Sequence, residues 1–351
     1  MRNMRKRADS RHCEQLLTTP QEIFTTLIRE LQRARESIDM EFYIFLGDRI
    51  GKTIATLLRR KARQGLRVRL VVDGYGSRHM PRKMRRQLRN DGIQLRVIHT
   101  FSHRRNHRKM VIVDQRTAFV GGINIADRYV VGNELGAWYD AVLRLEGSGV
   151  MPLCRLFEYD FATEATRTPP TPDTSVHSPV LYWSESGGGG AMTRLLYDVI
   201  DGAERDITLT TPYFMPPREV LHRLGRAIER GVAVRVVIPR RCDIWLIDDI
   251  MRHSIREAQS LGIEVSLLDN AFIHAKLALV DSRRVVVGSA NLDAHSLTVN
   301  RELMLSSYNR TTCSQAREFL QQLQHKATPA RDHEIKCHLP RFITRAITPL
   351  M

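Results

Sequence analysis

The sequence contains the pattern His-x-Lys-x4-Asp twice, and in each copy an asparagine follows 17 positions after the histidine. A histidine can serve near neutral pH as an unprotonated nucleophile or as a protonated acid, because its reference pKa is about 6.5. Two such histidines can divide these roles between them. The candidate catalytic residues are His107, Lys109 and Asp114 in the first copy and His274, Lys276 and Asp281 in the second.

The lysines and asparagines of the two copies are suited to binding a phosphate anion. A lysine two residues along a strand from a histidine points to the same face, since side chains alternate with a period of two. The asparagine follows a turn that glycine permits, and it offers an uncharged NH2 donor to the same anion. That turn is Gly121-Gly122 in the first copy and Gly288-Ser289 in the second, so a hydroxyl is present on one side only. The candidate phosphate-binding residues are Asn124, Asn291 and Ser289.

The elements expected around the two motifs also repeat. Apolar and β-branched runs predict matched strands, and apolar residues at helical spacing predict a helix after the first strand of each set. This alternation is typical of an α/β fold whose sheets are covered by helices. We therefore expect two halves related by a pseudo-twofold axis, with the active site at their seam. The matched strands are 38–45 with 207–214, 68–72 with 234–238, and 92–97 with 262–267.

Composition along the chain predicts five segments. Three prolines between 169 and 172 mark the connection between the halves, and the glycine run 187–190 is either a flexible loop or a backbone surface close to the ligand. The chain of 351 residues is long enough for two substantial cores. The expected segments are a basic N-terminal arm (1–20), a first half (21–162), a Pro/Gly-rich linker (163–190), a second half (191–330) and a C-terminal extension (331–351).

The charge of the chain points to a negatively charged partner. A formal net charge of +16 suits anionic phospholipid and nucleic acid equally. The basic run from Arg78 to Arg89 is either a headgroup-binding surface or a solvated helix face. The apolar group from Trp245 to Ile250 is either a contact for acyl chains or a buried helix face. Charge and pattern alone leave both alternatives open.

Neither a metal nor another cofactor is expected. The five cysteines lack a Cys-x2-Cys pair, which argues against a zinc site and suggests a reducing compartment. His99, His103 and His107 recur at four-residue intervals, but surrounding arginines disfavour a cation and the second motif has no matching histidines. No apolar run reaches the roughly 18 residues that span a bilayer. We therefore expect a cytoplasmic protein, which, if its anionic partner is phospholipid, visits the inner face of the cell membrane peripherally.

The duplicated motif and the segments that flank it resemble those of the phospholipase D superfamily, and within it those of the bacterial cardiolipin synthases. The resemblance covers most of the chain. The sequence segments that carry the resemblance are Asn106-His107-Arg108-Lys109, Gly121-Gly122-Ile123-Asn124-Ile125, Trp138-Tyr139-Asp140, Thr211-Pro212-Tyr213-Phe214 and Gly288-Ser289-Ala290-Asn291-Leu292-Asp293, followed by Ser296, Asn300 and Glu302.

This resemblance implies metal-independent phosphatidyl transfer, in which two phosphatidylglycerols become cardiolipin and glycerol. His107 would form a phosphohistidine and His274 would act as acid and then base. Lys109, Lys276, Asn124 and Asn291 would stabilise the phosphate oxygens. Asp140 and Glu302 are candidates to orient the two imidazoles, whereas Asp114 and Asp281 are expected to be structural members of the motif.

Two other activities suit the same pair of histidines. One is a phospholipase D-type hydrolase, or a transferase with a different acceptor alcohol. The other is a nuclease, which the positive charge favours but the scarcity of aromatic stacking residues disfavours. The expected partners are thus phosphatidylglycerol and an anionic membrane surface rather than nucleic acid. Because both motifs lie in one chain, an oligomer is not required to complete the site.

Overall fold

The structure is a computed structural model, and it describes residues 12–99, 104–162, 179–185, 187, 190–331, 337 and 339–340. Several sequence expectations therefore lie outside the described residues. They are most of the basic N-terminal arm, residues 163–178 of the linker, Gly188 and Gly189 of the glycine run, His103 and most of the C-terminal extension.

The first half is built on a seven-stranded sheet with the order β1-β8-β6-β5-β2-β3-β4. β2 is parallel to β3, which is parallel to β4, whereas the strands on the other side of β2 pair antiparallel. The strands are β1 (Cys13–Leu17), β2 (Ser37–Phe42), β3 (Arg67–Asp73), β4 (Gln94–Ile98), β5 (Met110–Val113), β6 (Thr117–Gly121) and β8 (Val142–Glu146). The helices are α1 (Pro20–Arg33), α2 (Arg49–Arg63), α3 (Arg82–Asn90), α4 (Arg128–Val131) and α5 (Met151–Phe161), with a 3-10 turn at Ser148–Val150.

The second half is built on an eight-stranded sheet with the order β19-β13-β12-β10-β15-β16-β18-β9. Its strands are β9 (Val180–Trp183), β10 (Asp206–Thr210), β12 (Ala233–Pro239), β13 (Glu264–Leu268), β15 (Leu277–Val280), β16 (Arg284–Gly288), β18 (Leu303–Ser307) and β19 (Ala327–Pro329). Its helices are α6 (Ala191–Asp201), α7 (Arg218–Glu229), α8 (Trp245–Ser260), α9 (Ala294–Thr298) and α10 (Arg310–Lys326). The pair β11 (Phe214–Met215) and β17 (Leu292–Asp293) forms a small separate sheet.

The two sheets share one arrangement of strands, so the α/β fold with two related halves is confirmed. The expected strand 207–214 is interrupted, because Pro212 has no N–H to donate to a ladder, and its end becomes β11. The expected strand 38–45 ends at Phe42, after which the carbonyl of Tyr43 accepts a hydrogen bond from the Ser77 hydroxyl instead.

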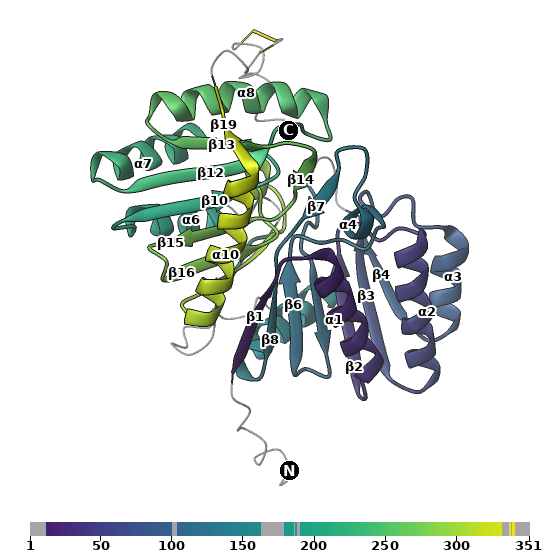
Figure 1. Cartoon of the computed structure of the whole chain (residues 1–351). Coiled ribbons are helices and arrows are strands. Elements are labelled where there is room, and N and C mark those ends of the chain that lie inside the picture. The colour runs from purple at the N-terminus through teal and green to yellow at the C-terminus, as the bar shows by residue number, and fades with distance from the viewer. Residues whose placement is uncertain are drawn as a thin grey trace.

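The halves lie side by side and meet through a shared apolar core (Figure 1). One face of the first sheet packs on α1, α2 and α3, and the opposite face contributes Val120 and Leu143 to a cluster with Val287 and Leu305 of the second sheet. A two-stranded parallel sheet, β7 (Ala137–Tyr139) with β14 (Ala271–Ile273), also joins the halves. In the described part of the chain, no helix has the length and apolarity needed to cross a bilayer.

The aspartates of the two motifs fasten matching loops. Asp114 accepts hydrogen bonds from the backbone N–H groups of residues 35–37, just before β2, at 2.7–3.1 Å. Asp281 does the same for residues 204–206, just before β10. Burial alone would raise the pKa of Asp281, but these N–H groups hold it below its ordinary value. Both carboxylates therefore hold the start of a central strand.

Replacing Asp281 by alanine should lower the free energy of unfolding by about 1–3 kcal/mol, because three backbone N–H groups lose their acceptor. Asp114→Ala should have an effect of similar size. Urea denaturation followed by circular dichroism measures both. Glu134→Ala removes an exposed carboxylate and is the control. A loss no larger than that of the control would show that the two aspartates do not stabilise the fold.

Candidate active site

His107 is hydrogen-bonded to a carboxylate from the other half of the chain. Its Nδ1 lies 2.9 and 3.1 Å from the two carboxylate oxygens of Glu302. The backbone sets this pairing, since the His107 N–H donates to the Arg301 carbonyl at 3.0 Å and the Arg301 N–H donates to the Arg105 carbonyl at 2.9 Å. Glu302 follows directly and is therefore in register with the imidazole.

His274 is held in the same way, with the two halves exchanged. Its Nδ1 lies 2.8 Å from Oδ2 of Asp140. The His274 N–H donates to the Tyr139 carbonyl at 2.7 Å, at the end of the β7–β14 pairing. Each histidine is thus placed by its own half, and its carboxylate neighbour comes from the opposite half.

The histidine–lysine segments do not lie within the main sheets, contrary to expectation. Residues 107–109 precede β5 and residues 274–276 precede β15. The N–H groups of His107 and His274 donate across the seam, as described above, so they are not available to a ladder within one sheet. The motifs therefore meet at the seam, and each lysine still lies close to its own histidine.

Both lysines are buried beside the imidazoles. The Lys276 Nζ lies 3.1 Å from each ring nitrogen of His274, and the Lys109 Nζ donates to the His107 carbonyl. Burial lowers the pKa of Lys276 to about 8 and lowers the pKa of Lys109 well below its ordinary value. The carboxylates of Asp140 and Glu302 oppose this shift at Lys276. Burial therefore disfavours the charged form of both lysines, and a bound anion would favour it again.

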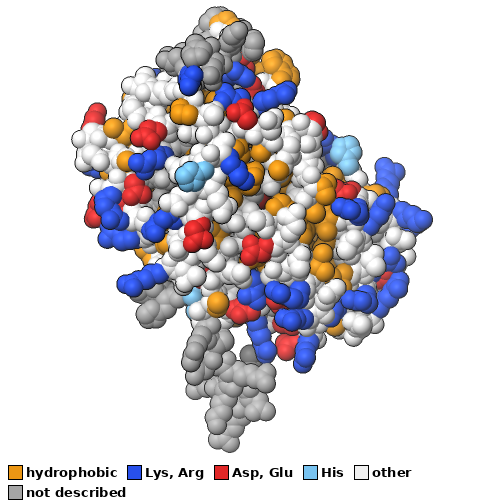
Figure 2. All heavy atoms as spheres, viewed as in Figure 1, with side chains coloured by type: hydrophobic (Ala, Val, Ile, Leu, Met, Phe, Trp, Pro, Cys, Tyr) orange, Lys and Arg blue, Asp and Glu red, His pale blue; other side chains and the backbone are white. Residues whose placement is uncertain are grey.

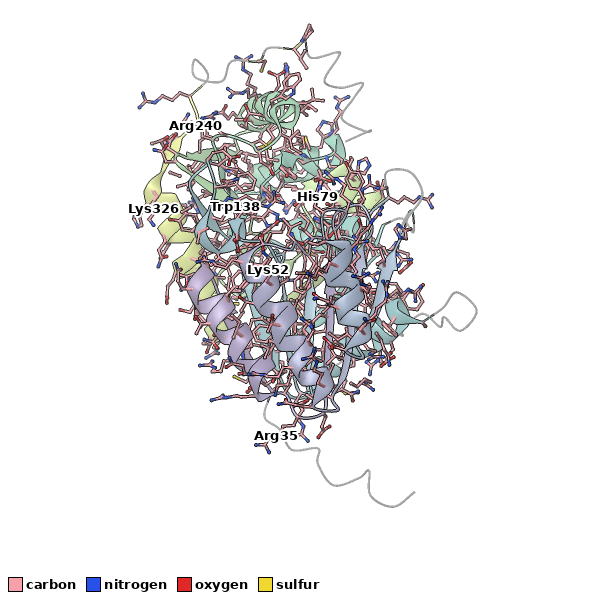
Figure 3. All side chains as sticks on the ribbon, turned by 90° about the vertical axis from the view of Figure 1, so that its right-hand side faces the viewer. Arg35, Lys52, His79, Trp138, Arg240 and Lys326 are labelled. Atoms are coloured by element: carbon pink, nitrogen blue, oxygen red, sulfur yellow. The ribbon has the colours of Figure 1, made fainter. Side chains whose placement is uncertain are left out.

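Aromatic rings enclose the two imidazoles. Trp138 stacks on His274 with a ring separation of 5.4 Å, and Tyr129 meets the same ring edge-on at 5.1 Å. Tyr43 meets His107 edge-on at 5.1 Å. In Figure 3, Trp138 lies midway between Lys52 of the first half and Arg240 of the second. In the sequence, Trp138 was noted only as part of a segment that carries the family resemblance. The two tyrosines were missed, because their spacing from the motifs does not indicate a contact with the histidines.

The imidazoles are neutral in this environment. Burial lowers the pKa of His107 to about 4, although Glu302 opposes the shift. Burial, followed by the charges of Lys276 and Lys109, holds the pKa of His274 well below its ordinary value. A neutral imidazole whose Nδ1 is bonded to a carboxylate keeps its proton on Nδ1, which leaves the Nε2 lone pair for a reactant.

The two carboxylates differ in their surroundings. Burial raises the pKa of Asp140 to about 6. Burial would also raise that of Glu302, but His107, Lys109 and Ser289 hold it below its ordinary value. Glu302 is therefore ionised at neutral pH, whereas the pKa of Asp140 lies closer to neutral pH.

The Ser289 hydroxyl is part of this difference. Its Oγ donates to Glu302 at 2.5 Å and accepts from the Leu303 N–H at 2.9 Å, so the hydroxyl expected to bind phosphate is directed to a carboxylate instead. At the matching Gly122, a Cβ would come within 2.2 Å of the Asp140 carboxylate. Gly122 thus leaves room for the Asp140 carboxylate, whereas Ser289 donates a hydrogen bond to the Glu302 carboxylate.

The two asparagines also differ. The Asn124 Oδ1 accepts from the Ile44 N–H at 3.0 Å, and its Nδ2 donates to the Tyr129 hydroxyl at 2.6 Å. The amide of Asn291 hydrogen-bonds Asp293, and its buried Oδ1 has no hydrogen-bond partner among the described residues. Both ends of the Asn124 amide are thus engaged by protein groups, whereas the oxygen of the Asn291 amide is not.

A buried ion-pair network lies behind His107. The fully buried Arg108 guanidinium contacts Asp160 and donates to the carbonyl groups of Ser184 and Glu302. Arg301 lies 3.6 Å from the same Asp160. Arg108 and Arg301 are the chain neighbours of His107 and Glu302, so the network fixes both segments. Breaking such a buried pair by removing one partner is typically costly.

The described residues contain no group of three or more His, Cys, Asp or Glu side chains that could hold a metal ion. What this part of the chain does assemble is two neutral imidazoles, two lysines and two carboxylates at one seam. One imidazole can attack an electrophilic phosphorus while the other moves a proton, and the lysines can neutralise the phosphate oxygens.

Comparison with known proteins finds relatives over nearly the whole chain. A family model described as "Cardiolipin synthase, PLD-like domain" matches residues 27–142 and 196–324, one match in each half. Cardiolipin synthase A of Pseudomonas putida is 31% identical over 96% of this chain and 74% of its own length. Cardiolipin synthase of Geobacillus kaustophilus is 29% identical over 96% of this chain and 72% of its own length.

Solved structures show the same fold at lower sequence identity. Phosphatidylserine synthase of Haemophilus influenzae superposes with a TM-score of 0.78 at 15% identity, over 95% of this chain and 92% of that one. Polyphosphate kinase of Porphyromonas gingivalis superposes with a TM-score of 0.67 at 18% identity, over 91% of this chain and 49% of that one. These two likenesses concern the fold alone.

The hydrogen bonds of the two imidazoles make a spectroscopic prediction. Long-range ¹H–¹⁵N correlation spectra at pH 7 should show His107 and His274 as neutral rings with the proton on Nδ1. Spectra of His107→Ala and His274→Ala assign the two signals. In Glu302→Gln only the His107 signal should change strongly, and in Asp140→Asn only the His274 signal. If Glu302→Gln altered His274 instead, the pairing of histidines and carboxylates described above would be wrong.

Proposed function

The chain belongs to the cardiolipin synthase family of phospholipase D-like proteins, and we propose that it joins two phosphatidylglycerol molecules into cardiolipin and releases glycerol. One observation carries the mechanism. Each imidazole has its Nδ1 bonded to a carboxylate of the opposite half, so in both rings Nε2 is the nitrogen available for chemistry at one phosphate. The Nε2 of His274 lies 3.1 Å from the Lys276 Nζ, the cation that we propose binds this phosphate. The relatives that cover nearly the whole chain bear the name of this activity.

In the first step, the Nε2 of His107 attacks the phosphorus of one phosphatidylglycerol. The bond between phosphorus and the headgroup glycerol oxygen breaks, and His274 gives its proton to that oxygen. The product is free glycerol and a phosphatidyl group on His107. The ionised Glu302 favours His107 as the nucleophile, because it stabilises the positive charge that the ring gains.

In the second step, His274 accepts the proton of a glycerol hydroxyl on the second phosphatidylglycerol. That oxygen attacks the phosphorus, the bond to His107 breaks, and cardiolipin leaves with both imidazoles restored. In the empty site burial keeps His274 neutral. A bound phosphate anion supplies the negative charge that lets this ring carry a proton in the first step.

Lys109, Lys276 and the two asparagine amides serve the phosphate oxygens in this proposal. Lys276 is supported by its position 3.1 Å from both ring nitrogens of His274. Asn291 is supported by its place beside Lys276 in the lining of one cavity, whereas the Asn124 Nδ2 already donates to the Tyr129 hydroxyl. Ser289 acts instead through Glu302, which its hydroxyl holds beside His107.

We further propose that the protein works on the inner face of the cell membrane as a peripheral protein. Helix α3 supports a membrane contact, because Met84 and Leu88 are buried while four of its basic residues are exposed. The exposed residues are Arg82, Lys83, Arg86 and Arg89. Figure 2 shows Lys and Arg side chains gathered over the first half, at the right and lower edges of that face. Trp245 is a second candidate contact, since 72% of it is exposed, whereas Ile247 and Ile250 belong to the core. The five free cysteines suit a reducing compartment.

Lipid mass spectrometry tests the activity. Purified protein incubated with phosphatidylglycerol vesicles in the presence of a chelator should produce cardiolipin and glycerol. His107→Ala should reduce the rate by at least about 10³-fold, because the covalent route is lost. Glu134→Ala should retain the wild-type rate.

The other activities predict different products. Phosphatidic acid in place of cardiolipin would mean that water is the acceptor. Cleavage of oligonucleotides without lipid turnover would mean a nuclease. Undiminished cardiolipin formation by His107→Ala would remove this residue from the mechanism.

The pKa of Lys276 predicts the alkaline limb of the pH profile. Burial lowers this pKa to about 8, so the cation is present below that pH and is lost as the pH rises through it. Because kcat/KM reports the free enzyme, it should fall above about pH 8, approaching tenfold per pH unit. Lys276→Arg keeps its charge at high pH, so its lower activity should lack this limb. A wild-type profile that stays flat to about pH 10 would contradict a role for the Lys276 charge.

A further inference from the structure

A cavity of about 80 Å³ lies beside Lys276 in the second half, between α6, α9 and the sheet. Lys276 and Asn291 line one part of it. Most of the remaining wall is apolar, and it includes Leu196 of α6, Ala278 of β15 and Val286 of β16. The cavity therefore borders the proposed phosphate site and extends from it into apolar surroundings.

The matching place in the first half, beside Lys109, contains only about 10 Å³ of space. The register of the sheets shows why. Val111 pairs with Phe119 across β5 and β6, and at the equivalent positions Ala278 pairs with Val286 across β15 and β16. Two larger side chains of the first half are thus replaced by smaller ones in the second.

The segment before each asparagine follows the same trend. Ile123 precedes Asn124, whereas Ala290 precedes Asn291. In the first half these positions are closed, since Val111 is 2% exposed and Ile123 is 5% exposed. Their counterparts Ala278 and Ala290 are both partly exposed, as is Leu196 on the helix above them. The second half is therefore open to a ligand where the first is packed.

The polar end of the cavity also differs from its counterpart. The Asn124 amide accepts from Ile44 and donates to Tyr129, but the buried Oδ1 of Asn291 meets no hydrogen-bond donor among the described residues. The Asn291 side chain is thus less tied to protein groups than that of Asn124, and with Lys276 it makes one end of the cavity polar. A site with one polar end next to a phosphate-binding lysine and an otherwise largely apolar wall fits an amphiphile.

We propose that this cavity receives the first methylene groups of one acyl chain of the lipid whose phosphate lies between the two histidines. The inference rests on the proposed function, because it takes the phosphate of that lipid to lie beside Lys276. It assigns the chain to the second half only, so the two motifs are equivalent in chemistry but not in lipid binding. Filling the cavity should therefore act on the alkyl chain and leave the phosphate contact intact.

The test is isothermal titration of the protein with ethyl, butyl, hexyl and octyl phosphate, below their aggregation concentrations. Wild-type affinity should rise with chain length, by about fourfold for each methylene that the cavity takes up. Ala278→Val and Ala290→Ile restore side chains of the size found in the first half. Both should flatten this dependence while keeping the affinity for ethyl phosphate within about twofold. Ile123→Val changes the packing beside Lys109 instead and should behave as wild type.

Thermal melting establishes that each variant folds, and Ala278→Val is the smaller change if Ala290→Ile does not. A chain-length dependence that survives in the folded variants would overturn the proposal, as would an equal loss of affinity for every chain length. Turnover of phosphatidylglycerol is measured on the same samples. Chain-length-dependent binding without lipid turnover would refute the proposed function and leave the cavity as an alkyl site. Lipid turnover together with an unchanged chain-length dependence in the variants would support the proposed function and refute the assignment of the acyl chain to this cavity.

Discussion

Two hydrogen bonds that cross the seam between the halves are the constraint on which the rest of the site depends. His107 is hydrogen-bonded to Glu302 and His274 to Asp140. In both cases the backbone N–H of the histidine donates to the carbonyl of the residue just before the carboxylate, which sets the register. Neither half is a complete site by itself. The apolar cluster between the two sheets and the β7–β14 pairing are therefore more than packing, because they determine the orientation of both imidazoles.

Burial gives this arrangement its chemical character. Removing the site from water disfavours charge on the histidines and lysines, while the carboxylates favour it. The result is two neutral imidazoles beside lysines whose pKa values burial lowers, Lys276 to about 8. In such a low-dielectric site, fixed donors are worth more than in water and need no rearrangement during the reaction. The ion-pair network around Arg108 keeps the segments that carry His107 and Glu302 rigid.

Much of this could be read from the sequence, because the chemistry requires particular residue types at a repeated spacing. The motifs, the two halves and the α/β fold all followed from it. Which carboxylate serves which histidine did not, since the partners are 195 and 134 positions apart and meet only when the halves dock. Ser289 was expected at the phosphate because it flanks Asn291, yet its hydroxyl is committed to Glu302. Pro212 could have been recognised as the end of a strand, since proline lacks the N–H that a ladder needs.

Duplication has left the halves alike in backbone and different in detail. Glu302 is held ionised with the help of Ser289, whereas Asp140 adjoins Gly122 and titrates nearer to neutrality. A strongly ionised neighbour suits the ring that gains a positive charge, and a more weakly ionised one suits the ring that exchanges protons. The asymmetry of the carboxylates thus supports the proposed division of roles between two histidines in otherwise similar motifs.

The most direct test of this account is to locate the covalent intermediate. Protein mixed rapidly with phosphatidylglycerol and quenched under alkaline conditions can be digested and mapped by peptide mass spectrometry. The account predicts the modified residue to be His107, with slower accumulation in Glu302→Gln. A modification found on His274, or one whose rate is unaffected by Glu302→Gln, would contradict it.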